Sequence, residues 1–147
     1  MQPVIFYREI LIKNAPNENK KLVQKYQRSG LSDPEIEEIV EKNQLYFEQN
    51  KPYLNAEFDL QKMSTEINVS RQNSSRVINE KLDKNFHRLV NEFRVSVVIN
   101  KMNDYSYSHL SLLGLALESG FNSKASFNRV NKEITGKTPS EFKMNHD

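Results

Sequence analysis

The stretch LGLALESGFNSKASFNRVNKEITGKTPSEF, from Leu113 to Phe142, decides how the rest of this chain is interpreted. It begins apolar, reaches Gly120 and Phe121, then turns polar and closes on Gly136 and a Lys-Thr-Pro sequence. Nothing in it resembles a catalytic motif. The spacing predicts two short helices that meet at a sharp corner, because glycine tolerates the left-handed backbone that such a corner needs. A polar face is left over for a partner.

An earlier stretch, FDLQKMSTEINVSRQNSSRVINEKL, has the same plan. Ser64 corresponds to Ala116 and Asn68 corresponds to Gly120, both at an offset of 52 positions. Small residues at 64 and 116 allow two helices to approach closely, and Asn or Gly suits the corner. The chain therefore contains two predicted helix-turn-helix units.

The second helix of each unit is expected to begin at a capping residue. Ser70 is placed to cap the first of these helices, and Asn122 or Ser123 the second. Arg76 corresponds to Arg129 at an offset of 53, so the second corner carries one extra residue.

A long helix is predicted between the two units. Its apolar residues follow one face at spacings of 3, 4, 7 and 11 positions: Phe86, Leu89, Val90, Phe93 and Val97. The expected fold is all-α, with two helix-turn-helix units joined by this helix. Residues 1–57 form an N-terminal helical extension and residues 58–143 the double helix-turn-helix domain.

The N-terminal extension is expected to contain a helix from Ser32 to about Gln49. Ser32 and Glu35 form a capping box, Pro34 fits the first turn, and Pro52 ends the segment. The inner positions of this helix are Ile36, Ile39, Asn43 and Tyr46. They allow two interpretations. The helix is either amphipathic and docked on its own domain, or it forms a homodimer seam through residues 32–49 in which a polar residue sets the register.

Composition limits the class of protein. The chain has 147 residues, of which 37% are hydrophobic and 27% charged, with no cysteine. Absence of cysteine excludes disulfide frameworks and thiolate metal sites. The sequence shows no signal peptide and no apolar run of about 18 residues, which predicts a cytoplasmic protein. Residues 58–147 carry 13 Lys and Arg against 10 Asp and Glu, a mildly basic balance that permits a polyanionic partner.

Enzymatic patterns are lacking in the sequence. His87, His109 and His146 lie far apart and form no i, i+4 pair. The sequence TGKTPS lacks the first glycine and the preceding strand of a phosphate-binding loop, and a turn followed by a last helix explains it. We therefore expect no enzymatic activity, no metal and no cofactor.

The second unit resembles the signature of the AraC/XylS family of transcription regulators. The similarity lies in LALESGFNSKASFNRVNKEITGKTPSEFK, including its GFNSKASFNR core and its GKTPSEF close. The first unit, the connecting NFHRLVNEFRV segment and the second unit follow in the family's order, from Phe58 to Lys143. The resemblance implies a double helix-turn-helix domain that binds double-stranded DNA and regulates transcription, with RNA polymerase as a further partner.

The resemblance also implies which side chains face the bases. In a helix-turn-helix the second helix enters the major groove. In the first unit the implied positions are Gln72, Ser75 and Arg76, which helical spacing also brings together; Gln72 suits adenine and Arg76 suits guanine. In the second unit, Ala125 suits a thymine methyl group, Asn128 adenine, and Arg129 guanine or phosphate. The set in the second unit is Lys124, Ala125, Asn128 and Arg129.

Simpler roles are the alternatives for these and neighbouring residues. Exposed Arg and Lys side chains are commonly only solvated. Arg94 is expected in a structural ion pair, and Phe121 and Phe127 in the core. Three hydroxyl side chains are expected to cap helices while contacting phosphates, and these are Ser70, Ser123 and Thr138.

Three positions depart from the family pattern. Ser74 stands where a core leucine is usual, so either the first unit packs loosely or its recognition helix is rotated. Asp83 replaces a glycine that ends the helix in a left-handed turn. Asn131 replaces a phenylalanine.

The upstream segment KYQRSGLSDPEIEEIVEKNQLYFEQNKPYL, Lys25 to Leu54, is similar to the one that precedes this domain in bacterial members with a multi-helix membrane sensor. This similarity implies an upstream membrane sensor half as a partner, with QPVIF at positions 2–6 as its end and Met1 not the natural start. The protein would then be tethered to the membrane in its full-length form.

The sequence thus predicts a sequence-specific regulator that reads two successive major grooves, roughly 34 Å apart, on one bent asymmetric site. One rival is an interaction module that does not bind DNA and acts through the N-terminal helix. The other is a small helical enzyme, which would need a pocket with clustered titratable groups.

Overall fold

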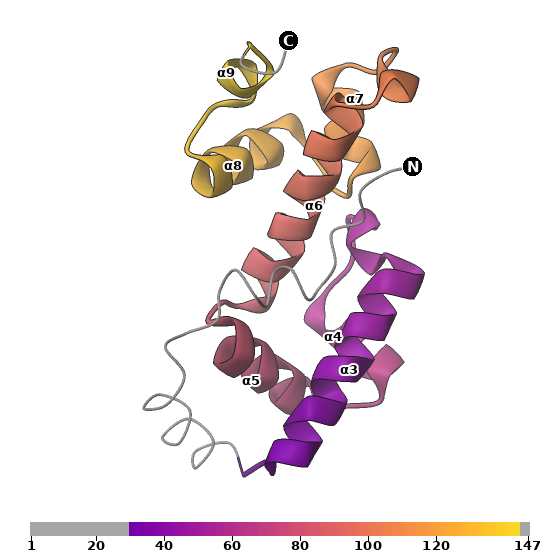
Figure 1. Ribbon diagram of the computed structural model, residues 1–147, viewed down its shortest axis with the longest axis vertical. Coiled ribbons are helices and arrows are strands. Elements are labelled where there is room, and N and C mark those ends of the chain that lie inside the picture. The colour runs from indigo at the N-terminus through magenta and orange to yellow at the C-terminus, as the bar shows by residue number, and fades with distance from the viewer. Residues whose placement is uncertain (1–29, 145–147) are drawn as a thin grey trace. The chain divides into compact units, whose positions relative to one another are not determined.

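The computed structural model describes residues 30–144, and the side chains of residues 30–141 (Figure 1). This part of the chain is helical and contains no strand, as the all-α prediction required. The expected membrane-proximal segment at positions 2–6 lies outside the described residues. In the described part, no helix combines the length and the apolar character needed to cross a bilayer. The elements are α3 (Asp33–Asn50), η1 (Pro52–Leu54), α4 (Leu60–Ile67), α5 (Arg71–Leu82), α6 (Phe86–Met102), η2 (Tyr105–Tyr107), α7 (Leu112–Glu118), α8 (Lys124–Thr135) and α9 (Pro139–Met144).

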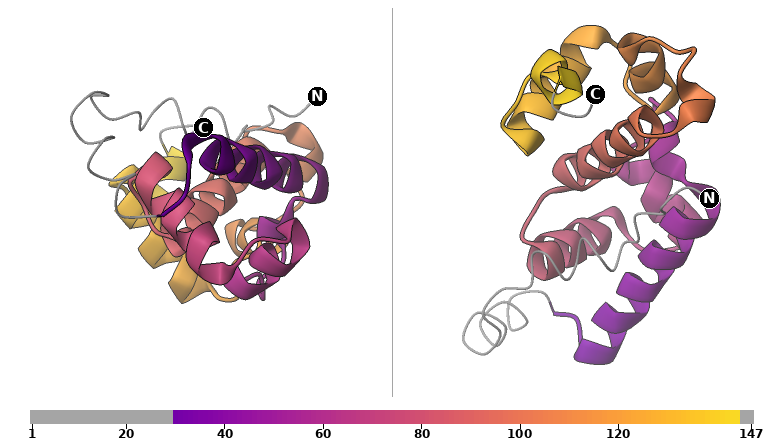
Figure 2. Two further views of the ribbon diagram at one scale, coloured as in Figure 1. Left: turned by 90° about the horizontal axis from the view of Figure 1, so that it is seen from below. Right: turned by 45° about the horizontal axis from the view of Figure 1, so that its top comes forward.

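The described residues form two compact units. The N-terminal unit comprises residues 30–52 and 58–89, and the C-terminal unit comprises residues 53–57 and 90–144. Helix α6 begins in the first unit and continues without a break into the second, as Figures 1 and 2 show. This is the predicted connecting helix.

In the N-terminal unit, α4 and α5 form the predicted helix-turn-helix. Asn68 ends α4 in the left-handed conformation, with φ of 55°, and Ser70 caps α5 by accepting a hydrogen bond from the Asn73 amide. Ser64 is buried and its hydroxyl donates to the Leu60 carbonyl, which keeps this polar group satisfied where the helices meet.

The C-terminal unit repeats this arrangement with α7 and α8. Gly120 forms the corner with φ of 102°, Ala116 is fully buried, and Ser123 caps α8. Helices α5 and α8 are each 12 residues long, and both of their ends differ by the predicted offset of 53 positions. The internal repeat is therefore confirmed.

The core of the C-terminal unit joins α6, α7 and α8. Phe121 and Phe127 are buried as predicted, with ring centroids 5.2 Å apart. The prediction for α6 needs one correction: Val97 is only half-buried, because the helix turns Val95 and Val98 into this core instead. The core residues are Val95, Val98, Leu115, Ala116, Phe121, Phe127 and Val130.

Helix α3 packs against α4 and α5 within the N-terminal unit. Its predicted capping box is present, since Ser32 accepts from the Glu35 amide while the Glu35 carboxylate accepts from the Ser32 amide at 2.7 Å. These hydrogen bonds from Ser32 lower the pKa of Glu35. Ile36, Ile39 and Asn43 are buried, as expected for a helix docked on its own domain. The homodimer seam stays a prediction, and so does the division of the chain at residues 57 and 58.

The structure accommodates each of the three departures from the family pattern in a different way. Ser74 is fully buried on the same face as Val77 and Ile78, so the recognition helix is not rotated. Asp83 adopts the left-handed conformation expected of glycine, with φ of 53°. Asn131 is buried and donates to the Lys137 carbonyl at 3.1 Å, which ties the end of α8 to the turn that follows.

Arg94 has the expected structural role, but its described partners are backbone carbonyls rather than a carboxylate. Its Nε donates to the Tyr53 carbonyl at 2.8 Å and its Nη2 donates to the Asn55 carbonyl at 2.9 Å. Partial burial lowers the pKa of the guanidinium, which still remains charged at neutral pH. Arg94 thus holds residues 53–55 within the C-terminal unit.

Candidate nucleic-acid interface

The predicted base-facing residues of the first unit share the outer face of α5. Gln72 is exposed, and Ser75 and Arg76 are half-buried one turn further along. The opposite face carries Val77 and Ile78, which are fully buried. Because the inner face fixes the rotation of α5, the three polar residues lie together on the side that a ligand can reach.

The matching residues of the second unit lie on the outer face of α8, and all of them are exposed: Lys124, Ala125, Asn128 and Arg129. Phe127 and Val130 hold the other face in the core. The Arg129 guanidinium lies 3.3 Å from the Glu133 carboxylate, but both side chains are more than half exposed. Such a pair contributes little, so Arg129 can exchange it for a stronger acceptor.

The three predicted phosphate contacts are all helix caps. Ser70 and Ser123 accept hydrogen bonds of 3.1 Å from the amides of Asn73 and Ser126. Thr138 accepts from the Glu141 amide at 3.3 Å, while its own amide donates to the Glu141 carboxylate. Capping is therefore present at each of these residues, and their contact with phosphate stays a prediction.

Each unit has a groove beside its recognition helix. The N-terminal groove, of about 300 Å³, is lined by the start of α4 at Asp59, by Arg71 and Ser75 of α5, and by the start of α6 at Asn85. The C-terminal groove, of about 620 Å³, is lined by the start of α7 at Ser111, by Lys124 and Asn128 of α8, and by the start of α9 at Thr138. These eight residues form four pairs, one at an offset of 52 and three at an offset of 53, so the two grooves occupy equivalent places in the repeat.

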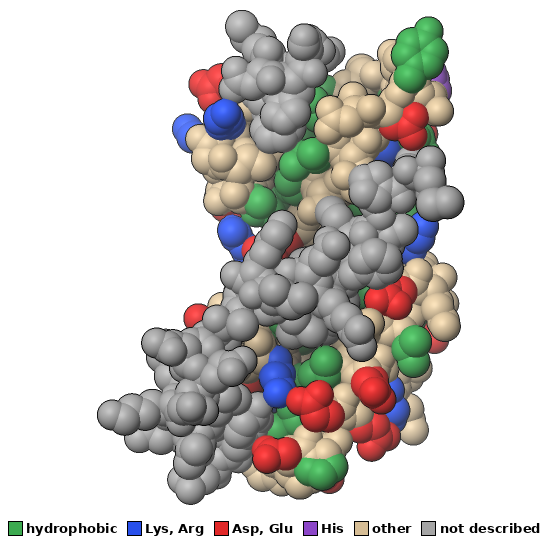
Figure 3. Space-filling model, in the orientation of Figure 1, with side chains coloured by type: hydrophobic (Ala, Val, Ile, Leu, Met, Phe, Trp, Pro, Cys, Tyr) green, Lys and Arg blue, Asp and Glu red, His purple; other side chains and the backbone are tan. Residues whose placement is uncertain are grey.

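Charge distinguishes α3 from the recognition helices. In the lower part of Figure 3, acidic side chains gather over α3. Exposed residues of this helix include Glu37, Glu38 and Glu41, and Glu37 accepts a hydrogen bond from Lys81 of α5 at 2.9 Å. This acidic surface disfavours a polyanion on α3 and leaves the outer face of α5 as the basic approach to the N-terminal unit.

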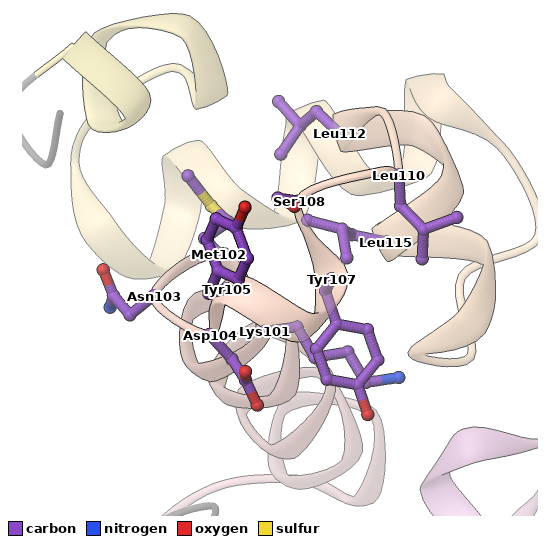
Figure 4. A pocket seen from close by; sticks show the side chains of 10 residues that line it. All are labelled: Lys101, Met102, Asn103, Asp104, Tyr105, Tyr107, Ser108, Leu110, Leu112 and Leu115. Atoms are coloured by element: carbon purple, nitrogen blue, oxygen red, sulfur yellow. The ribbon is translucent and has the colours of Figure 1, made fainter.

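A further hollow of about 440 Å³ lies at the end of α6, against η2 and α7 (Figure 4). Lys101 lies beside the Tyr107 ring, 5.0 Å from its centroid, and pairs with Glu118 at 3.3 Å. Asp104 accepts from the Ser106 amide at 2.9 Å. The charged groups of this hollow therefore serve local structure. Among the described residues, no group of three or more His, Cys, Asp or Glu is placed to hold a metal ion.

Comparison with known proteins agrees with this geometry. A family model described as a helix-turn-helix domain, of the AraC type, matches residues 63–145, which include both recognition helices. The chain belongs to the AraC-type helix-turn-helix family. No solved structure matches it.

Relatives of this AraC-type chain include proteins of Staphylococcus aureus. It is 26% identical over 116 residues to an uncharacterized HTH-type transcriptional regulator of strain COL, and 25% identical over the same length to one of strain MSSA476. Each match covers 79% of this chain but only 14% of the relative. The chain thus spans about one seventh of the length of these relatives.

Several residues of the candidate interface were not identified from the sequence. Asp59, Arg71, Ser111 and Lys132 line the two grooves. The repeat offsets contained a usable signal, since Arg71 corresponds to Lys124. The offsets did not show that a third helix also lines each groove: the start of α6 lines the N-terminal groove, and the start of α9 lines the C-terminal groove.

Proposed function

We propose that this chain is a sequence-specific DNA-binding transcription regulator, or the DNA-binding part of one, that reads two successive major grooves with α5 and α8. The observation that carries the proposal is the repeat itself. Two recognition helices of equal length each bury one face in their own unit and expose polar side chains at equivalent positions. A single helical hairpin would be common among proteins, whereas two with matched outer faces favour a ligand with a repeating surface, as DNA has.

The side chains on these faces suit base edges. Gln72 and Asn128 carry amides that can pair with adenine, while Arg76 and Arg129 carry guanidinium groups that can pair with guanine. Ser75, Lys124 and Ala125 complete the two faces. Each good bidentate contact contributes about 1–3 kcal/mol of discrimination between bases. Successive major grooves on one side of the duplex are roughly 34 Å apart, and bending of the DNA would let both helices enter.

Selection from a pool of random duplexes, performed at low and at high salt, tests this function. The expected result is one asymmetric motif with two conserved blocks about one helical turn apart. Binding should weaken steeply with salt because phosphate contacts release counterions. Enrichment of one block alone would contradict reading by α5, and no enrichment at either salt would contradict the function.

Further partners belong to this proposal. We propose that the sensory input lies elsewhere, in an upstream membrane half, as the resemblance of residues 25–54 implies, or in a partner protein; the chain spans about one seventh of the relatives' length. RNA polymerase is the proposed partner at the promoter. A protein-interaction module that acts through α3 would need another face of that helix, since Ile36, Ile39 and Asn43 are buried in the N-terminal unit.

A further inference from the structure

The two grooves are equivalent in position but not in charge. The charged side chains Lys124, Arg129 and Lys132 line the C-terminal groove, and no carboxylate does so among the described residues. In the N-terminal groove the corresponding charges are one guanidinium, that of Arg71, and one carboxylate, that of Asp59. Formally, the first set carries three positive charges, of which Arg129 pairs with the exposed Glu133 outside the groove lining, whereas Arg71 and Asp59 cancel.

The difference in charge between the two grooves depends in part on one pair of equivalent residues, Asp59 and Ser111. Asp59 is the N-cap of α4, and its carboxylate accepts from the Lys62 amide at 2.8 Å. Ser111 is the N-cap of α7, and its hydroxyl accepts from the Gly114 amide at 3.0 Å. Aspartate and serine cap helices about equally well, so either residue could accept the backbone amide hydrogen bond at either place. What changes between them is the negative charge that the groove presents.

A DNA phosphate is the ligand that would respond to this difference. Asn128 and Arg129, on the outer face of α8, line the C-terminal groove, so a duplex bound to that face would bring its sugar-phosphate backbone to the groove. Sequence-independent contacts of this kind fix a protein on the duplex and make its affinity depend on salt. A carboxylate at the same place repels the phosphate.

On the basis of the proposed function, we propose that the C-terminal groove holds a DNA phosphate and the N-terminal groove does not, because Asp59 excludes it. The C-terminal unit then supplies most of the attachment to the backbone. The N-terminal unit contributes base contacts with little phosphate anchoring.

A reciprocal exchange of the two caps tests the assignment. The full 147-residue chain is titrated with a labelled duplex pool of random sequence over a series of salt concentrations. Ser111→Asp should weaken binding roughly fivefold and flatten the salt slope by about one, whereas Asp59→Ser should strengthen binding roughly fivefold and steepen the slope by about one. Thermal unfolding should be unchanged in both variants, because each keeps a capping oxygen.

Matched controls separate local charge from net charge. Glu66→Gln changes the net charge as Asp59→Ser does, at an exposed position of the same helix outside the groove lining. Ser106→Asp matches Ser111→Asp at an exposed position of η2. Both controls should leave the salt slope unchanged. If Ser111→Asp fails to fold, Lys132→Gln replaces it, with the same expected loss of affinity.

Each other outcome has a definite meaning. If the exchanged caps behave like their controls, or if Asp59→Ser weakens binding, the groove assignment is overturned while DNA binding stands. If the unaltered chain binds no duplex at the lowest salt, the proposed function fails and the groove assignment falls with it.

Discussion

Gly120 shows how much a single residue can determine at the corner of the C-terminal unit. Its φ of 102° is rarely adopted by residues with a side chain, and an added Cβ would lie 2.1 Å from the Tyr53 carbonyl oxygen and 2.7 Å from Arg94 Nε. The corner therefore needs glycine for two reasons, its backbone conformation and the close approach of residues 53–55. The corner of the N-terminal unit, at Asn68, adopts φ of 55° with asparagine.

Gly120→Ala is expected to lower the free energy of unfolding by about 3 kcal/mol, because the new methyl group meets a backbone carbonyl that cannot move aside easily. Gly136→Ala is the matched control. Gly136 also has a positive φ, of 75°, but nothing lies within 4 Å of its added Cβ, so the cost should be about 1 kcal/mol. Urea unfolding measures both, and equal costs would contradict the steric argument.

Two buried asparagines allow a second test at this scale. Both polar atoms of the Asn43 side chain lack a hydrogen-bond partner among the described residues, whereas the Asn131 amide donates to the Lys137 carbonyl. Asn43→Leu should therefore raise the free energy of unfolding by about 1 kcal/mol, and Asn131→Leu should lower it by about the same amount. A loss of stability in both variants would show that Asn43 is satisfied in solution.

At the scale of the element, α6 joins the two units, and two of its residues hold the segment 53–55 in the C-terminal unit. Phe93 stacks on Tyr53 with ring centroids 4.9 Å apart, and the next residue, Arg94, holds the Tyr53 and Asn55 carbonyls. One turn of α6 thus fixes the short segment that follows α3. Burial of Tyr53 in this contact raises the pKa of its hydroxyl.

Substitution of Arg94 should change the stability of the fold, whereas substitution of Arg129 should change the affinity for DNA. Arg94→Met removes the donor to two carbonyls and should lower the free energy of unfolding by about 1–3 kcal/mol without changing the salt slope of DNA binding. Arg129→Met loses only an exposed ion pair, so stability should change little. DNA affinity should fall instead. Thermal unfolding and duplex titration on both variants decide the point, and a reduced salt slope in Arg94→Met would contradict its structural role.

For the whole molecule, the presence of one recognition helix in each unit predicts that the two blocks of one site are read separately. Arg76→Ala should relax base preference in one block of the selected motif and Arg129→Ala in the other, each by about 1–3 kcal/mol. Repeating the duplex selection with each variant identifies the block that is lost. The proposed function would be abandoned if the double variant bound the selected DNA as tightly as the unaltered chain.

Much of the architecture could be predicted from local signals. The capping box at Ser32, the corners at Asn68 and Gly120 and the caps at Ser70 and Ser123 all depend on residues within about four positions of one another. The offset between the repeats placed both recognition helices. Base contacts by these helices remain predictions.

Contacts between distant residues were decided only by the tertiary structure. Arg94 donates to carbonyls about 40 positions earlier in the chain, and no periodicity of the sequence predicts such a bond, so these partners were not expected. The docking of α3 was left open because an amphipathic helix buries the same face on its own domain as on a second copy. The grooves form where a third helix returns to the first two. By itself the sequence determined helices, caps, corners and the repeat, since these depend on near neighbours; tertiary packing determined which polar groups share a groove.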